Sequence, residues 1–176
     1  MQHTLVALVE DKPGVLNRVA SLFRRRAYNI ESLTVGHTEQ PGISRMTIVV
    51  DNDQTNIAHV VSNLYKLVNT IQVTDLGETP TVERDLAMIK VCADNNNRTS
   101  IMQLVDVFRA RIVDVANDSL IVEITGVEEK INSFVDVLKP FGILEMVRTG
   151  IVAMARGNNS PMNYHANGNG NGYKAN

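Results

Sequence analysis

Pro13 and Gly14 form the stretch of the chain that is best suited to bind a small ligand. They follow an apolar run at residues 5–9 and the acidic pair Glu10 and Asp11, and they precede an apolar stripe at helical spacing. Proline suits the first turn of a helix, because its missing N–H would have no intrahelical acceptor there. Gly14 places no side chain over the first backbone N–H groups, which together with the helix dipole attract a small carboxylate. The pattern predicts a sensor for a small amino acid.

A second polar residue, Asn29, opens the next predicted strand, at residues 28–37. We expect this strand to lie close enough for Asn29 to reach the same pocket as Gly14. Two structural alternatives remain open at this point. Pro13 and Gly14 can simply start a helix that packs closely on a sheet, and Asn29 can cap the start of its strand.

Residues for catalysis or metal binding do not form a recognisable pattern. No histidine stands at metal-ligand spacing with another histidine, a cysteine or a pair of carboxylates, and the single cysteine, Cys92, has no candidate base in a known motif. Glycine-rich phosphate loops and the nucleophile motif of hydrolases are also missing from the sequence. His59 lies between apolar positions of a predicted helix, where a surface position is favoured over a ligand role. The sequence predicts no catalytic and no metal site, and a chain that controls an enzyme.

The composition favours a cytoplasmic protein. The chain has 176 residues, 44% of them hydrophobic, and a formal net charge of −2, which argues against nucleic acid or an anionic membrane as partner. A lone cysteine suits a reducing compartment, and no apolar run approaches the ~18–20 residues of a membrane span. The basic cluster at residues 24–26 complements the dipole at the end of a helix, or provides a contact edge for another subunit.

The order of predicted elements repeats. In the first half, strands at residues 5–9, 28–37, 43–50 and 71–76 alternate with helices that begin near Pro13 and after Asp51-Asn52-Asp53, which we expect to cap the second helix. In the second half, the corresponding strands are residues 82–93, 111–116, 120–125 and 141–155, and the helices are residues 97–110 and 128–139.

This order predicts the fold class α+β, with two tandem ferredoxin-like βαββαβ domains. The predicted domains are residues 1–77 and 78–157, joined by a linker that is rich in turn-forming residues. Residues 158–176 are rich in asparagine and glycine and predict a disordered tail, because they lack the apolar surface that offsets ordering entropy.

The stretch at residues 10–19 resembles the opening of an ACT domain, a small-molecule-binding regulatory module. Longer blocks are similar to the family of small regulatory subunits of acetolactate synthase (acetohydroxyacid synthase), and the resemblance spans roughly residues 2–157. These blocks are residues 14–19, 28–35, 44–48, 66–68, 82–86, 108–115, 125–126 and 148–150.

The resemblance implies a non-catalytic subunit that works with a separate, larger catalytic chain. That chain carries thiamine diphosphate, Mg²⁺ and FAD, and it condenses pyruvate with a second 2-oxo acid on the route to valine, leucine and isoleucine. This chain is then expected to hold no cofactor, to stimulate the catalytic subunit and to confer feedback inhibition, typically by valine. The resemblance also implies a homodimer through the ACT domains, with the effector bound at their interface.

Site residues are carried over from the same resemblance. Gly14 and Val15 match the helix start that holds the effector carboxylate, and Asn29 and Ile30 match the residues that fix the amino acid. Three residues match the strand that lines the pocket from the partner subunit: Thr34, Val35 and Gly36.

Asp11 departs from the asparagine of some relatives. A carboxylate at this position pairs with the effector's ammonium group or repels its carboxylate, so the identity of the effector depends on it. Two other functions remain as alternatives. One is a free-standing amino-acid sensor that regulates another enzyme or transcription, and the other is a small enzyme on a ferredoxin-like fold.

Overall fold

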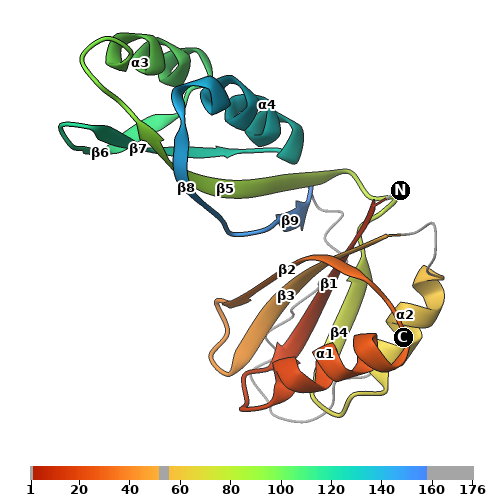
Figure 1. Cartoon of the computed structure of the whole chain (residues 1–176). Helices are drawn as coiled ribbons and strands as arrows, with labels where there is room; N and C mark the ends of the chain where they lie inside the picture. Colours follow the sequence, from red (N-terminus) through yellow and green to blue (C-terminus); the bar gives the residue numbers. More distant parts are fainter. Residues whose placement is uncertain (1, 52–55, 158–176) are drawn as a thin grey trace. The chain divides into compact units, whose positions relative to one another are not determined.

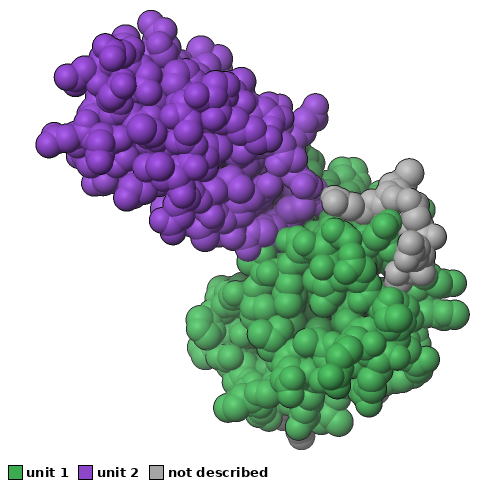
Figure 2. All heavy atoms as spheres, in the orientation of Figure 1, with its two compact units in different colours: residues 1–82, 153–176 green, residues 83–152 purple. Residues whose placement is uncertain are grey.

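The computed structural model describes residues 2–51 and 56–157. They form two compact units, the first made of Met1–Val82 with the segment that begins at Ala153, and the second of Glu83–Val152 (Figure 2). The predicted tail, residues 158–176, lies outside the described part of the chain. The fold prediction of two ferredoxin-like domains is confirmed.

In the first unit, a four-stranded antiparallel sheet has the strand order β2-β3-β1-β4 (Figure 1). Since β1 and β2 each pair antiparallel with β3, β1 and β2 run in the same direction. The elements are β1 (Gln2–Glu10), α1 (Val15–Arg25), β2 (Ile30–His37), β3 (Ile43–Asp51), α2 (Ile57–Tyr65) and β4 (Thr70–Asp75).

The core of the first unit lies between its sheet and its two helices. Because side chains alternate along a strand, Leu5, Ala7 and Val9 of β1 share one face of the sheet, and they pack against apolar side chains at helical spacing on the two helices. The neighbouring residues Val6 and Leu8 face the other side of the sheet and are also fully buried. Their cover comes partly from Ala153, far along the chain, and partly from Ile43 and Leu76.

The second unit repeats this arrangement with the strand order β6-β7-β5-β8. Its core is again closed by two helices on one face of the sheet (Figure 1). The elements are β5 (Thr81–Cys92), α3 (Arg98–Val107), β6 (Arg111–Val115), β7 (Ser119–Gly126), α4 (Glu128–Leu138), a 3₁₀ turn (Lys139–Phe141) and β8 (Ile143–Arg148). The last strand, β9 (Val152–Ala155), pairs with β5, and all of it after Val152 belongs to the first unit.

The last predicted strand, residues 141–155, is two strands in the structure. β8 ends at Arg148 and β9 begins at Val152, and Gly150 between them has a φ of 88°, which interrupts extended backbone. The compact units also divide the chain differently from the predicted boundary after residue 77. Ala153 belongs to the first unit, where its carbonyl accepts a hydrogen bond of 2.6 Å from the Arg45 guanidinium.

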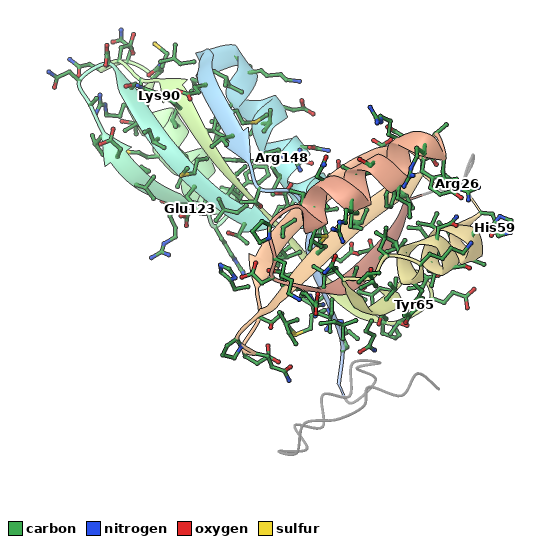
Figure 3. The ribbon with its side chains drawn as sticks, turned by 90° about the horizontal axis from the view of Figure 1, so that it is seen from below. Arg26, His59, Tyr65, Lys90, Glu123 and Arg148 are labelled. Carbon is green, nitrogen blue, oxygen red and sulfur yellow. The ribbon has the colours of Figure 1, made fainter. Side chains whose placement is uncertain are left out.

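The cap of α2 also differs from the prediction. Asp51 is the last residue of β3, and Asn52 and Asp53 lie outside the described residues. The observed cap is Asn56, whose side chain accepts a hydrogen bond of 3.3 Å from the backbone N–H of His59. The side chain of His59 is exposed on α2, as predicted (Figure 3).

Substituting Gly77 is expected to destabilise the protein. A Cβ on Gly77 would lie 2.0 Å from Nε2 of His3, whose ring is held on the other side by Asp75 at 3.3 Å. We expect Gly77→Ala to lower the free energy of unfolding by about 1–3 kcal/mol, measured by urea denaturation. The matched control is Gly36→Ala, because a Cβ on Gly36 would meet nothing within 4 Å. Equal losses in the two variants would contradict the role of the His3 contact.

Candidate functional site

The turn between β1 and α1 positions the predicted helix start. Gly14 has a φ of 83°, in the left-handed region, and is the N-cap of a helix that begins at Val15. Pro13 therefore lies one residue before the N-cap, near the start of the helix as predicted. Glycine suits position 14 for its backbone conformation, since other residues are strained at this φ.

The first turn of α1 carries no side-chain cap and no acidic residue. Val15, which was expected to offer its N–H to a ligand, already donates it to the Lys12 carbonyl at 3.3 Å. Within the described residues, the backbone N–H groups of Leu16 and Asn17 have no acceptor. These two N–H groups, with the positive end of the helix dipole, form the anion-binding part of the site. The sequence analysis did not name them, although the first N–H groups of any helix have no intrahelical acceptor.

Asp11 lies beside this helix start. Its backbone N–H donates to the Gly42 carbonyl at 2.8 Å, and its carboxylate Oδ2 is 3.3 Å from Nδ1 of His37 at the end of β2. His37 is a site residue that the sequence analysis missed, because only the register of the sheet brings it to Asp11. The turn and the helix start thus offer N–H donors for a carboxylate and, three residues before the N-cap, an acidic group for a cation.

Asn29 does not lie at this end of the same chain. Ile30 and His3 both pair with Val50, whereas His37 and Val9 both pair with Ser44. At ~3.3 Å per residue, the start of β2 is on the order of 20 Å from its end along the sheet. The expectation that Asn29 reaches the Gly14 pocket within one chain is therefore wrong. The Asn29 side chain is exposed and donates to the carboxylate of Glu31.

The other predicted residues of β2 are at the helix-start end or in the middle of the strand. Thr34, Val35 and Gly36 pair with Thr47, Met46 and Arg45 of β3, so they lie between Ile30 and the His37 end. β2 is an edge strand of its sheet, and Val35 is exposed on it, whereas Ile30 packs against the core.

The second unit has a different turn at the equivalent place. There the carboxylate of Asp94 accepts hydrogen bonds from the backbone N–H groups of Asn96 at 2.8 Å and Asn97 at 3.0 Å. The Arg98 side chain adds hydrogen bonds to the carbonyls of Ala93 and Ala116. A carboxylate of the chain itself thus lies in the turn before α3, at the place where the first unit has left-handed Gly14.

The pKa of Glu10, at the end of β1, is lowered from its ordinary value by a hydrogen bond from the Asn69 side chain and by Lys12. A carboxyl with a lowered pKa stabilises the fold above its unfolded pKa of 4.5, and this contribution disappears as the pH falls through the lower folded pKa. We expect Glu10→Gln to reduce stability at neutral pH, and the difference from the wild type to shrink below pH 4.5. Urea denaturation across this pH range measures it. A difference that stays constant with pH would contradict this role of the carboxylate.

Among residues 2–51 and 56–157, no group of three or more histidine, cysteine, aspartate or glutamate residues is arranged to hold a metal ion. None of the helices in the described part of the chain combines the length and the hydropathy that a membrane crossing requires.

Both units match family models. Residues 5–72 match the model of the ACT domain that is like that of acetohydroxyacid synthase (AHAS) small subunits, and residues 84–157 match the model of the small subunit of acetolactate synthase. A probable acetolactate synthase small subunit of Archaeoglobus fulgidus is 54% identical over 158 residues, which cover 90% of this chain and 99% of that protein. The acetolactate synthase small subunit of Mycolicibacterium smegmatis is 49% identical over 155 residues, 88% of this chain and 91% of that protein.

The fold agrees with a solved structure of the same kind. The crystal structure of the acetolactate synthase small subunit from Thermotoga maritima has a TM-score of 0.84 and 44% sequence identity, and the match covers 90% of this chain and 99% of that one. The repeated βαββαβ fold, the uncapped start of α1 and these matches to both units lead to one conclusion: the chain belongs to the family of acetolactate synthase small subunits.

Proposed function

We propose that this chain is the regulatory subunit of an acetolactate synthase, which stimulates the catalytic subunit and makes it sensitive to feedback inhibition by valine. Family membership supports the regulatory role. The single observation that carries the effector proposal is the start of α1, with left-handed Gly14 and free N–H groups on Leu16 and Asn17. An α-amino acid has the carboxylate that these groups bind and an ammonium group that Asp11 attracts.

The effector site is completed by a second copy of the chain. β2 is an edge strand, and pairing two edges is a common way to satisfy their backbone groups. In an antiparallel pair of β2 strands, the start of one strand lies beside the end of the other. The partner subunit's Asn29 and Ile30 then approach the end of β2 at His37. Asp11 lies at the same end, because its carboxylate contacts the His37 ring. Two-fold symmetry gives two such sites per dimer.

Valine fits the chemistry of this shared site. Its carboxylate binds the N–H groups of Leu16 and Asn17, and its ammonium group binds the Asp11 carboxylate in exchange for the contact with His37. The partner subunit's Asn29 supplies an amide that holds either charged group. Burial of the isopropyl group contributes about 1.5–3 kcal/mol. Asp11 favours an effector with a free ammonium group over a simple 2-oxo acid.

Inhibition requires that valine bind one state of the holoenzyme better than another. Valine then shifts the equilibrium toward the less active arrangement by its difference in affinity for the two states. We assign effector binding and dimerisation to residues 1–77 and contact with the catalytic subunit to residues 78–157. Stimulation of the catalytic subunit by residues 1–78 alone would contradict this division.

In this proposal the catalytic subunit, and not this chain, carries out the reaction. The catalytic subunit carries thiamine diphosphate, Mg²⁺ and FAD, and this chain carries none of them. The pair then works in the cytoplasm, in the biosynthesis of valine, leucine and isoleucine.

A mixing assay tests the proposed function. The purified chain is added to the acetolactate synthase catalytic subunit from the same source, and acetolactate formation is measured with and without valine. We expect stimulation that saturates with the added chain and is reversed by valine. No effect of the chain at stoichiometric excess would overturn the regulatory role, and stimulation that valine leaves unchanged would overturn the effector assignment.

A further inference from the structure

A groove of about 500 Å³ lies between α1 and the turn that follows α2, within the first unit. Arg26, the C-cap of α1 labelled in Figure 3, is not part of the lining. Four of the lining side chains are cationic, two are neutral polar and two are apolar, and none is acidic. They are Arg18, Arg24, Arg25 and Lys66, then Asn17 and Ser21, then Leu67 and Val68.

The four cations have no carboxylate partner within the described residues. Arg18 donates to Oδ1 of Asn69 at 2.7 Å, and Lys66 donates to Oδ1 of Asn63 at 3.2 Å. Arg25 donates to the carbonyl of Ser21 at 3.3 Å. All three acceptors are neutral oxygens, so these contacts orient the side chains and leave their charges uncompensated.

The nearest acidic group in this network is Glu10, which is already engaged. Its carboxylate accepts a hydrogen bond of 2.6 Å from the Asn69 side chain and forms an ion pair of 3.0 Å with Lys12. Glu10 therefore holds Asn69, which in turn holds Arg18, and it serves to position that guanidinium.

The helix dipole explains only part of this cluster. Arg24 and Arg25 lie in the last turn of α1, where cations are favoured. Arg18 lies in the first half of the helix, and Lys66 belongs to a different element. Like charges repel, so a concave surface that gathers cations from two elements has a strong positive potential. Such a surface is suited to a multivalent anion.

We propose that this groove binds a small phosphorylated molecule that carries at least two phosphate groups. Guanidinium groups bind phosphate oxygens in a bidentate manner, and Lys66 adds a point charge. One carboxylate or one phosphate would leave most of the positive charge unmatched, whereas a di- or triphosphate matches it. The groove volume is that of a small-molecule site. Leu67 and Val68, which is 88% exposed, offer apolar contact to the organic part of the ligand.

This site differs from the proposed effector site in place and in ligand. The effector site uses the backbone N–H groups of Leu16 and Asn17, whereas the groove uses side chains from Asn17 onward and from the turn after α2. A test of the groove therefore does not depend on valine binding.

Calorimetric titration of the full-length chain with inorganic tripolyphosphate, at about 0.15 M salt, tests the proposal. We expect saturable binding, and affinity that decreases from tripolyphosphate to pyrophosphate to orthophosphate. The double variant Arg24→Gln/Arg25→Gln should bind at least about tenfold more weakly. The control Arg26→Gln/Arg84→Gln has the same net charge but keeps the groove, and we expect its affinity within about twofold of wild type. Circular dichroism checks that both variants are folded.

Three results would overturn the proposal. The first is no saturable binding at this salt concentration, and the second is an equal loss in the two double variants, which would mean attraction by net charge alone. The third is tighter binding of a short oligoglutamate peptide than of tripolyphosphate, which would assign the groove to an acidic protein segment.

Discussion

Leu16→Pro is expected to raise the Kd for valine by at least about tenfold while the protein stays folded. Proline removes the backbone N–H that we assign to the effector carboxylate, and a charge-assisted hydrogen bond contributes about 1.5–3 kcal/mol. Leu16 is exposed in the first turn of α1, a position that tolerates proline because no intrahelical hydrogen bond is lost. Calorimetric titration with valine measures the change, and unfolding by urea checks the fold.

The matched control is Thr99→Pro, at the same position of α3 in the second unit. Thr99 is also exposed, and the turn before its helix already contains the Asp94 carboxylate. We expect this variant to bind valine as the wild type does. If both proline variants lost valine equally, the effect would come from general destabilisation and not from the N–H of Leu16.

Asp85→Ala is expected to lower the free energy of unfolding by about 3–5 kcal/mol, because it leaves a partly buried guanidinium without its partner. Asp85 is 3% exposed and accepts hydrogen bonds from Nε of Arg148 at 2.8 Å and from a second nitrogen of the same guanidinium. Its other oxygen accepts from the Thr149 hydroxyl at 3.3 Å. This cluster joins β5 to the end of β8, where Arg148 is labelled in Figure 3. Urea denaturation of the full chain measures the loss.

Asp136→Ala is the control for Asp85→Ala. Asp136 and Lys139 form an ion pair of 2.7 Å on the surface of the second unit, with both side chains about two-thirds exposed. An exposed pair contributes at most about 1 kcal/mol. A loss for Asp85→Ala that is no greater than that for Asp136→Ala would contradict the assigned role of burial.

The repeated fold could be predicted because its signals are local. Apolar residues at helical spacing on α1, such as Val15, Val19 and Phe23, predict a helix whatever lies opposite. Because the same order of elements occurs in both halves, the sequence also predicts two domains with one shared topology. The packing of Ala153 on Val6 and Leu8 could not be predicted in this way, because no periodicity in the sequence indicates which distant segment covers the second face of a sheet.

The candidate site also combines features that neighbouring residues encode with features that depend on distant segments. The helix start is encoded by neighbouring residues, and the helix begins at Val15, close to the predicted start near Pro13. The position of Asn29 depends on strand direction and register, which place it at the far end of the sheet in its own chain. The contact between His37 and Asp11 depends on the same register. Residues that meet only across a sheet, or across two chains, leave no local pattern in a sequence.

Subunit complementation tests most directly whether the effector site is shared between two chains. Leu16→Pro and Asn29→Ala each damage one half of the site. In a mixed dimer of the two variants, a shared arrangement places both defects in one site and leaves the other site intact. We predict that each variant alone binds valine weakly, and that coexpression of the two restores wild-type affinity at about a quarter of all sites, since random pairing makes half of the dimers mixed. Calorimetric titration of the coexpressed sample that finds no high-affinity sites, although mixed dimers are present, would contradict a site built from two subunits.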